Sequence, residues 1–126
     1  MERLRMGIIG TGMAFERLHY PAYQELADKL QIVAICNEDL QKAKNWQNTL
    51  GLRDEDVYSD FHEMLQRTDI DAFDIMVPIG ENFEVMDEVA KAGKPIICEK
   101  PLAPTKKQAK AAKELPKRYD IPIMIA

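Results

Sequence analysis

Two short stretches of this sequence place chemically active residues directly after apolar runs. In the first, Gly10, Thr11 and Gly12 follow an apolar segment and open a helical pattern. Glycines at these positions allow a tight turn, and the backbone amides at the start of a helix can bind the pyrophosphate of a dinucleotide. The sequence therefore predicts a dinucleotide-binding loop that also includes Met13 and Ala14.

This glycine motif is incomplete, because the third glycine of the usual pattern is replaced by Phe15. We expect the aromatic ring to force the helix slightly away from the sheet. A glycine pair alone more often marks a structural turn than a nucleotide site. Here a strand precedes the pair and a helix follows it, and this context favours the dinucleotide interpretation.

The second stretch is "IICEKPLAP", in which Glu99 and Lys100 lie between an apolar run and Pro101. A lysine ammonium beside a reacting hydroxyl can orient it and stabilise alkoxide character during hydride transfer. Glu99 could position that lysine or neutralise it. The alternative is a surface lysine that forms a salt bridge where a strand ends.

The apolar run "QIVAIC" ends in Asn37, where dinucleotide folds usually place an acid that holds the ribose hydroxyls. Asn37 can still form a hydrogen bond with a ribose. Glu38 would repel a 2′-phosphate, and no arginine is present there to bind one. The sequence thus favours NAD over NADP, and we interpret Asp39 only as a helix cap.

Apolar runs alternate with helical patterns along the whole chain, which indicates an α/β domain with a parallel sheet. We predict a doubly wound Rossmann fold with six strands in the order 3-2-1-4-5-6. The expected strands cover residues 4–9, 31–36, 56–59, 71–77, 95–98 and 121–126. The expected helices cover 13–29, 40–50, a short segment after Asp60, 81–92 and a segment from Thr105.

Three features of these elements are predicted in more detail. The first helix should bury one face and break in two at Pro21, since an internal proline removes a backbone donor. Strand 31–36 should be buried on both faces, and Pro116 should end or kink the last helix. The face that the spacing of apolar residues predicts for the first helix consists of Phe15, Leu18, Ala22 and Leu26.

The loops that follow strands one, four and five should meet, because open α/β sheets bind ligands beyond the carboxyl ends of their strands. In this arrangement the stretches "GIIGTGMAFERLHYPAY" and "DIMVPIGENFEVMDEVAKAGKPIICEKPLAPT" resemble the cofactor domain of the Gfo/Idh/MocA oxidoreductases. The resemblance covers nearly the whole chain, and the Glu-Lys-Pro turn is its most specific part.

The resemblance implies an enzyme that moves hydride between a pyridine nucleotide and a sugar, polyol or related hydroxy compound. It places Lys100 near the nicotinamide and the substrate hydroxyl, with Glu99 in the same pocket. It also implies that Val77 and Pro78 begin a loop that touches the nicotinamide ribose. Asn82 stands where family members often have histidine.

The resemblance further implies a second α/β domain that supplies much of the substrate site. We therefore interpret residues 1–126 as a cofactor domain with little or no turnover of its own. A stand-alone nucleotide sensor or scaffolding module is the alternative, and a purely structural role is a third. An assembly of identical subunits in a full-length parent is left open.

Composition and charge narrow the remaining classes of function. With 126 residues, 46% of them hydrophobic, the chain fits one core. Its net charge of −4, without a basic stripe interleaved with aromatics, argues against a nucleic-acid partner. No run of apolar residues could span a membrane and no secretory signal is present, so we expect a cytoplasmic protein.

The cysteines and histidines show no metal-binding or disulfide pattern. Cys36 and Cys98 lie in separate apolar runs, and in the predicted strand order they are too far apart to form a disulfide. We expect both to be buried free thiols. His19 and His62 have no further ligands at metal-binding spacing, so no metal site is predicted.

Overall fold

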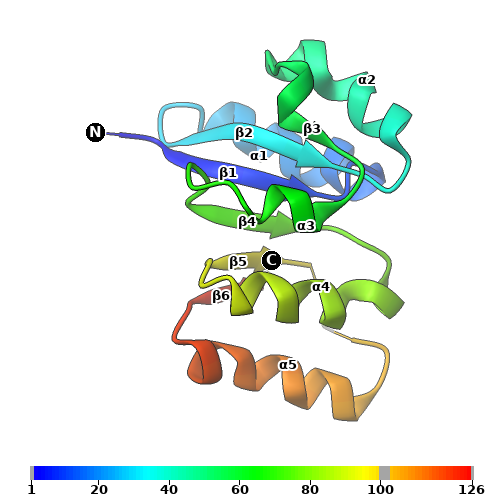
Figure 1. Cartoon of the computed structure of the whole chain (residues 1–126), viewed down its shortest axis with the longest axis vertical. Coiled ribbons are helices and arrows are strands. Elements are labelled where there is room, and N and C mark those ends of the chain that lie inside the picture. Colours follow the sequence, from blue (N-terminus) through cyan, green and yellow to red (C-terminus); the bar gives the residue numbers. More distant parts are fainter. Residues whose placement is uncertain (1, 100–102, 126) are drawn as a thin grey trace.

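The computed structural model describes residues 2–99 and 103–125 of the chain. Within them, a parallel sheet of six strands is covered by helices on both faces (Figure 1). The strands are β1 (Leu4–Ile9), β2 (Leu30–Cys36), β3 (Val57–Tyr58), β4 (Ala72–Ile75), β5 (Ile96–Cys98) and β6 (Ile123–Ile125). Their order, β3-β2-β1-β4-β5-β6, confirms the predicted topology.

Helical segments connect all consecutive strands. Two of them are short: η1 is a π-helical turn and η2 is a 3₁₀ turn. The segments are η1 (Phe15–His19), α1 (Tyr20–Glu25), α2 (Leu40–Leu50), η2 (Asp54–Asp56), α3 (Phe61–Met64), α4 (Ile79–Lys91) and α5 (Lys106–Tyr119).

The two faces of the sheet carry separate hydrophobic clusters. On one face, η1, α1 and α2 pack through residues that include Phe15, Tyr23 and Ala43. On the other, α3, α4 and α5 contribute residues that include Met64 and Met86. In Figure 1, α1 lies behind the sheet and α3 in front of it. The central strands are therefore covered on both sides, as the apolar runs predict.

Aspartate side chains cap the starts of two helices, and a glycine ends one of them, where the sequence predicts. Asp39 accepts a hydrogen bond from the amide of Gln41 at 3.1 Å, and α2 ends at Gly51, whose φ of 68° is left-handed. Asp60 caps α3 in the same way through the amide of His62, at 2.9 Å. Each of these predicted caps is confirmed.

The predicted inward face of the first helix is wrong after Phe15. Leu18 is 64% exposed and Ala22 is exposed, whereas His19 is half-buried and Tyr23 is buried. The π-helical turn η1 contains one residue more than an α-helical turn, and this shifts the inward positions by one residue. The helical segment does not break at Pro21, which lies in the first turn of α1.

Two further expectations are corrected. Only the second half of β2 is buried, because Gln31 is exposed and Ile32 and Val33 are half-buried beside an open cavity. Helix α5 continues through Pro116 to Tyr119, so the predicted early end is wrong. A proline in the last turn of a helix removes a single backbone hydrogen bond, so the helix is not forced to end there.

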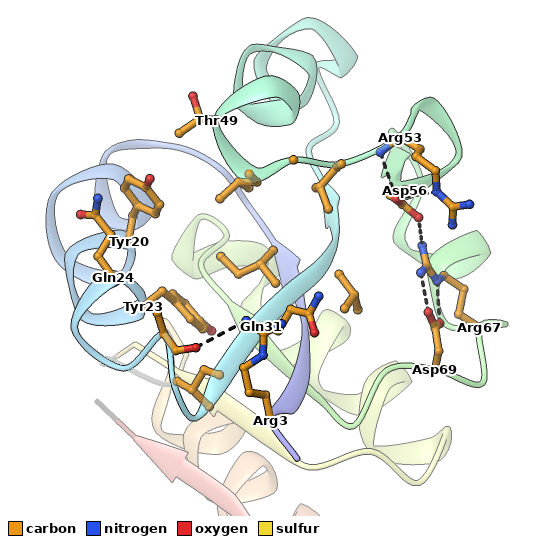
Figure 2. Close-up of a pocket in the computed structure, with 17 residues that line it drawn as sticks. Arg3, Tyr20, Tyr23, Gln24, Gln31, Thr49, Arg53, Asp56, Arg67 and Asp69 are labelled. Carbon is orange, nitrogen blue, oxygen red and sulfur yellow. Dashed lines mark hydrogen bonds and ion pairs between the residues drawn. The ribbon is translucent and has the colours of Figure 1, made fainter. Parts of the chain in front are cut away.

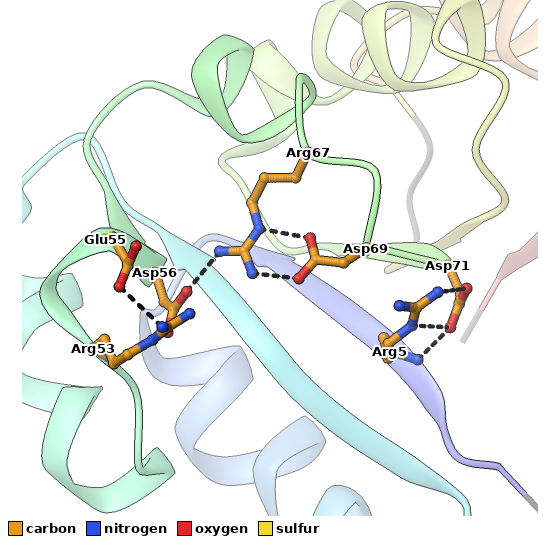
Figure 3. Close-up of polar contacts among 7 residues, drawn as sticks. All are labelled: Arg5, Arg53, Glu55, Asp56, Arg67, Asp69 and Asp71. Atoms are coloured by element: carbon orange, nitrogen blue, oxygen red, sulfur yellow. Dashed lines mark hydrogen bonds and ion pairs between the residues drawn. The ribbon is translucent and has the colours of Figure 1, made fainter.

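Arginine and aspartate side chains connect the loops that lead into β3 and β4 (Figure 3). Arg67 donates to Asp56 at 2.8 Å and forms a two-pronged pair with Asp69. Burial acts to raise the pKa of Asp56, but hydrogen bonds from the Arg53 backbone and from Arg67 bring it below its usual value. Arg5 on β1 pairs with Asp71 at the entrance to β4.

Gly10 follows β1 and comes very close to the end of β4. Its φ is 101°, and a Cβ at this position would lie 2.1 Å from the carbonyl oxygen of Met76. The amide of Gly10 donates to the carbonyl of Cys36 at 2.9 Å. The glycine is therefore required both by its backbone conformation and by the space available to it.

Gly10→Ala should destabilise the domain by about 3 kcal/mol or more, because it adds a backbone clash to a left-handed conformation. Gly12→Ala is the matched control, since a Cβ there would meet nothing within 4 Å. Urea unfolding of both variants measures the effect. Equal stability of the two variants would contradict the close approach at Gly10.

Candidate functional site

The carboxyl ends of the strands form one row across the sheet. Ile9 is in register with Cys36 on β2 and with Ile75 on β4, and Ile75 is in register with Cys98 on β5. The residues that follow these strands therefore leave the sheet at one edge. They include every segment that the sequence predicts for the site.

A large open cavity of about 930 Å³ lies at this edge. Gly10 and Gly12 border it, together with the end of β2 and the loop after β4. The predicted site residues that line it are Gly10, Gly12, Asn37, Glu38, Val77 and Pro78. This is the position in which open α/β sheets bind ligands.

Asn37 connects the glycine loop to the end of β2. The side-chain NH₂ of Asn37 donates to the hydroxyl of Thr11 at 3.0 Å. Its side-chain oxygen Oδ1 accepts a hydrogen bond from the backbone amide of Asp39 at 2.9 Å. Thr11 is buried under this contact. Asn37 thus fixes the shape of the loop and also faces the cavity.

The remaining predicted residues lie in different surroundings. Met13 is 61% exposed and Ala14 is half-buried at the start of the helical segment. Asn82 is buried within α4, where its side-chain amide donates to the sulfur of Met86 at 3.4 Å, and it is not among the residues lining the cavity. Glu99 is half-buried after β5 and is also not among the residues lining the cavity, although the sequence predicts it in the same pocket as Lys100. Lys100 lies outside the described residues, so its catalytic role stays a prediction.

Phe15 fills the position of the missing glycine without blocking the loop. Its ring is fully buried and packs edge-on against Trp46, with ring centroids 4.8 Å apart. The ring belongs to the hydrophobic cluster on the face covered by α2. Gly12 has open space around it, since a Cβ there would meet nothing within 4 Å.

Carboxylates dominate the charged lining of the cavity. Glu38 and Asp39 lie at the end of β2, and Asp60 lies beyond β3. Among the described residues, Lys42 borders the same space. The α4 side of the cavity adds Glu81, Glu84, Asp87 and Glu88. A ligand with extra negative charge at this wall would be repelled.

A second cavity of about 460 Å³ lies across the first half of β2 (Figure 2). Tyr20, Tyr23 and Gln24 of the first helical segment form one side, and Thr49 of α2 lies on another. Arg67 is among its lining residues but is already paired with carboxylates. This cavity also includes Leu30 at the amino end of β2, away from the edge where the predicted site residues meet.

Sequence analysis missed a cluster of charged side chains beside the predicted site. Asp74 is 1% exposed in β4, and its Oδ2 accepts hydrogen bonds from His19 Nδ1 at 2.7 Å and Tyr23 at 2.9 Å. His19 Nε2 contacts Glu99 Oε1. The available signal was an aspartate inside an apolar strand, since a buried charge needs partners.

The pKa of His19 is raised to about 9, first by the hydrogen bond with Asp74 and then, against the opposing effect of burial, by Glu99. The imidazole side chain is 9% exposed. Burial, with Asp74 beside it, also raises the pKa of the Tyr23 hydroxyl above its usual value. Around neutral pH, His19 is therefore a cation and Tyr23 a neutral donor.

The cysteines, possible metal ligands and possible membrane-spanning helices were also considered in the sequence. Cys36 and Cys98 are buried and unpaired, as predicted, and β1 and β4 separate their strands. Among residues 2–99 and 103–125, no group of histidine, cysteine or acidic side chains is arranged to hold a metal ion. In this part of the chain, no helix combines the length and hydrophobicity needed to cross a membrane.

Comparison with known proteins matches residues 4–126 to a family model described as an oxidoreductase family with an NAD-binding Rossmann fold. An uncharacterized protein of Saccharomyces cerevisiae is 32% identical over 100% of this chain and 36% of its own length. Inositol 2-dehydrogenase of Azotobacter vinelandii is 36% identical over 81% of this chain and 30% of its own. The chain thus spans about a third of the length of these relatives.

Solved structures share the fold. An oxidoreductase from Agrobacterium radiobacter, in complex with NAD⁺, L-tartaric acid and magnesium, superposes with a TM-score of 0.87 and 27% sequence identity. The match covers 98% of this chain and 35% of that protein. The likeness extends over the whole sheet and its helices.

His19 should make stability depend on pH in a defined direction. A histidine whose pKa is higher in the folded than in the unfolded state stabilises fully below about pH 6.5, and this contribution is lost as pH rises through the folded pKa of about 9. Between these values, the free energy of unfolding should fall by on the order of 1 kcal/mol, after allowance for solvent screening.

Urea unfolding between pH 6.5 and 8.5 measures this dependence, and the matched variant His19→Asn should lack it. The comparison with the variant is needed because both buried thiols also lower the stability above about pH 8, where they titrate in the unfolded chain while burial raises the folded pKa of Cys36 to about 12 and that of Cys98 to about 11. The same slope in wild type and His19→Asn would contradict the assignment.

Proposed function

Because this chain belongs to the Gfo/Idh/MocA family of oxidoreductases, we propose that it binds NAD at the carboxyl edge of its sheet and forms the cofactor half of a hydride-transfer site. The observation that carries the proposal is the cavity between Gly12, Asn37 and Pro78. It combines a glycine loop, a helix start and the ends of several parallel strands, which together form the usual environment of a dinucleotide.

The pyrophosphate is assigned to the glycine loop. Gly12 leaves the space that phosphate oxygens need, and the helical segment that follows supplies backbone amides. Thr11 and Asn37 hold this loop against β2 through their hydrogen bond. The residues present therefore fit a dinucleotide, with Met13 and Ala14 on the outer side of the loop.

The ribose of the adenosine half is assigned to Asn37 and Glu38. A carboxylate at this position accepts hydrogen bonds from ribose hydroxyls but repels a 2′-phosphate. Asp39 and Asp60 extend the negative charge along the same wall. This charge distribution supports NAD over NADP as the preferred cofactor.

The nicotinamide half is assigned to the loop after β4 and the end of β5. Val77 and Pro78 line the cavity there, and Glu99 follows β5 at the same edge. A bound nicotinamide supplies or accepts the hydride. Lys100 is proposed to orient the substrate hydroxyl and stabilise its alkoxide character, as a nearby ammonium can.

The substrate class is proposed to be a sugar, a polyol or a related hydroxy compound. Support comes from the relative named inositol 2-dehydrogenase, since inositol is a polyol. The relatives are about three times as long as this chain, which supports a further domain as the source of most substrate contacts. On this proposal, the 126 residues alone bind cofactor with little or no turnover.

Titration of the 126-residue chain with NADH tests the proposal. We expect saturable binding at micromolar to millimolar concentrations, measured by calorimetry and by the fluorescence of NADH. Gly12→Val should weaken binding about tenfold or more, because its side chain enters the space assigned to the phosphates. NADPH should bind less tightly than NADH.

The control for these measurements is Thr49→Val, which changes a residue of the cavity across β2 and should leave NADH affinity unchanged. Absence of saturable binding of both NADH and NADPH up to millimolar concentration would contradict the proposal. It would then favour a structural role for the domain.

A further inference from the structure

Asp74, His19 and Glu99 form a continuous chain of charged contacts from the middle of the sheet to its carboxyl edge. The three residues come from β4, from η1 and from the segment after β5. His19 is the central member, with one ring nitrogen on each carboxylate. The exposed fraction of the side chain rises along these contacts, from 2% for Asp74 and 9% for His19 to 31% for Glu99.

The contacts define the protonation state of His19. A carboxylate only accepts hydrogen bonds, so two carboxylates on the two ring nitrogens require both nitrogens to carry a proton. The raised pKa of His19, about 9, agrees with this geometry. The imidazolium therefore donates to Asp74 through Nδ1 and to Glu99 through Nε2.

Asp74 is the rigidly held residue at one end of this row of contacts. It lies in a strand paired on both sides, and its Oδ2 also accepts a hydrogen bond from Tyr23. Its Oδ1 is buried with no hydrogen-bond partner among the described residues. A buried carboxylate of this kind is costly, and its direct compensation is the cation of His19.

We propose that His19 is a positioning residue that transmits the fixed orientation of Asp74 to Glu99. Glu99 follows β5 at the edge of the sheet assigned to the nicotinamide, although it is not among the residues lining the cavity. This inference rests on the proposed function, which assigns that edge to the reacting ring. Glu99 directly precedes Lys100 in the sequence.

The same contacts set the charge next to the nicotinamide. Two carboxyl groups contact one imidazolium and Tyr23 adds no charge, so acidic groups outnumber the cation in the cluster. Cys98 on β5 is also uncharged around neutral pH, because burial and the charges of Asp74 and Glu99 raise its pKa to about 11. Carboxylates at this place favour a neighbouring cation, such as an oxidised nicotinamide.

The π-helical turn explains how His19 reaches this position. A regular helix with Phe15 facing inward would direct Leu18 and Ala22 to the sheet. The additional residue of η1 brings His19 and Tyr23 to Asp74 instead. Turns of this type are frequent at functional sites, which agrees with a functional use of the contact.

The first test does not depend on cofactor. Imidazole ¹⁵N spectra of the chain at pH 7 should show both nitrogens of His19 protonated. The ¹³C signal of the Glu99 carboxyl should shift as His19 loses its proton near pH 9. His19→Asn should abolish this shift. Tyr23→Phe is the matched control, since it removes one donor from Asp74 but keeps His19 between the carboxylates, and it should retain the shift.

A neutral His19 at pH 7, or a Glu99 signal in wild type that does not respond near pH 9, would overturn the inference whatever the protein binds. The same holds if Tyr23→Phe loses the shift as completely as His19→Asn, because the cluster would then act only as a buried support.

The second test measures the surroundings of the nicotinamide ring separately from the affinity for NADH. Calorimetry gives the affinity for NADH, and the fluorescence enhancement at saturation reports the surroundings of the nicotinamide ring. His19→Asn should lower the enhancement per bound NADH at least about twofold, whereas Tyr23→Phe should preserve it. In wild type, the enhancement should decline as pH rises through about 9.

The outcomes separate the two proposals. If wild type does not bind NADH although the carboxyl shift is present, the proposed function fails while the contact between His19 and Glu99 stands, and the positioning role at a nicotinamide site is rejected. If NADH binds and saturated His19→Asn gives the wild-type enhancement, the proposed function stands and the positioning role is rejected.

Discussion

The close approach of Gly10 to the carbonyl of Met76 sets the geometry on which the carboxyl edge depends. A Cβ at Gly10 would lie 2.1 Å from that oxygen, so the loop after β1 and the end of β4 meet only because the side chain is absent. The amide of Gly10 also holds the end of β2. The ends of β2, β1 and β4 are thereby held side by side. The strand order reverses between β1 and β4, and the cavity opens at this place.

The second constraint is the charge of Asp74 inside the sheet. An aspartate at this depth requires compensation, and the structure supplies it through His19 and Tyr23. This requirement connects the first helical segment to β4 and, through Glu99, to the end of β5. Local stability and the arrangement of the proposed nicotinamide end therefore depend on the same few hydrogen bonds.

Most of the architecture was predictable, because strand runs, glycines and caps carry local signals: Asp39, Asp60 and Gly51 act as the sequence indicates. The inward face of the first helix was not predictable, since a π-helical turn changes the spacing and apolar Leu18 lies outside while His19 lies inside. The glycine loop and Asn37 were found by their motif. His19 was considered only as a metal ligand, because its partners are distant in sequence and meet it only through the fold.

The central claim is that the carboxyl edge, and not the cavity across β2, takes the dinucleotide. Addition of NAD⁺ to the ¹⁵N-labelled chain tests it most directly through the backbone amide signals. The account predicts shifts concentrated at Gly10, Gly12 and Glu38, with Gln31 and Thr49 unchanged. Shifts concentrated at Gln31 and Thr49, with the glycine loop unaffected, would contradict it.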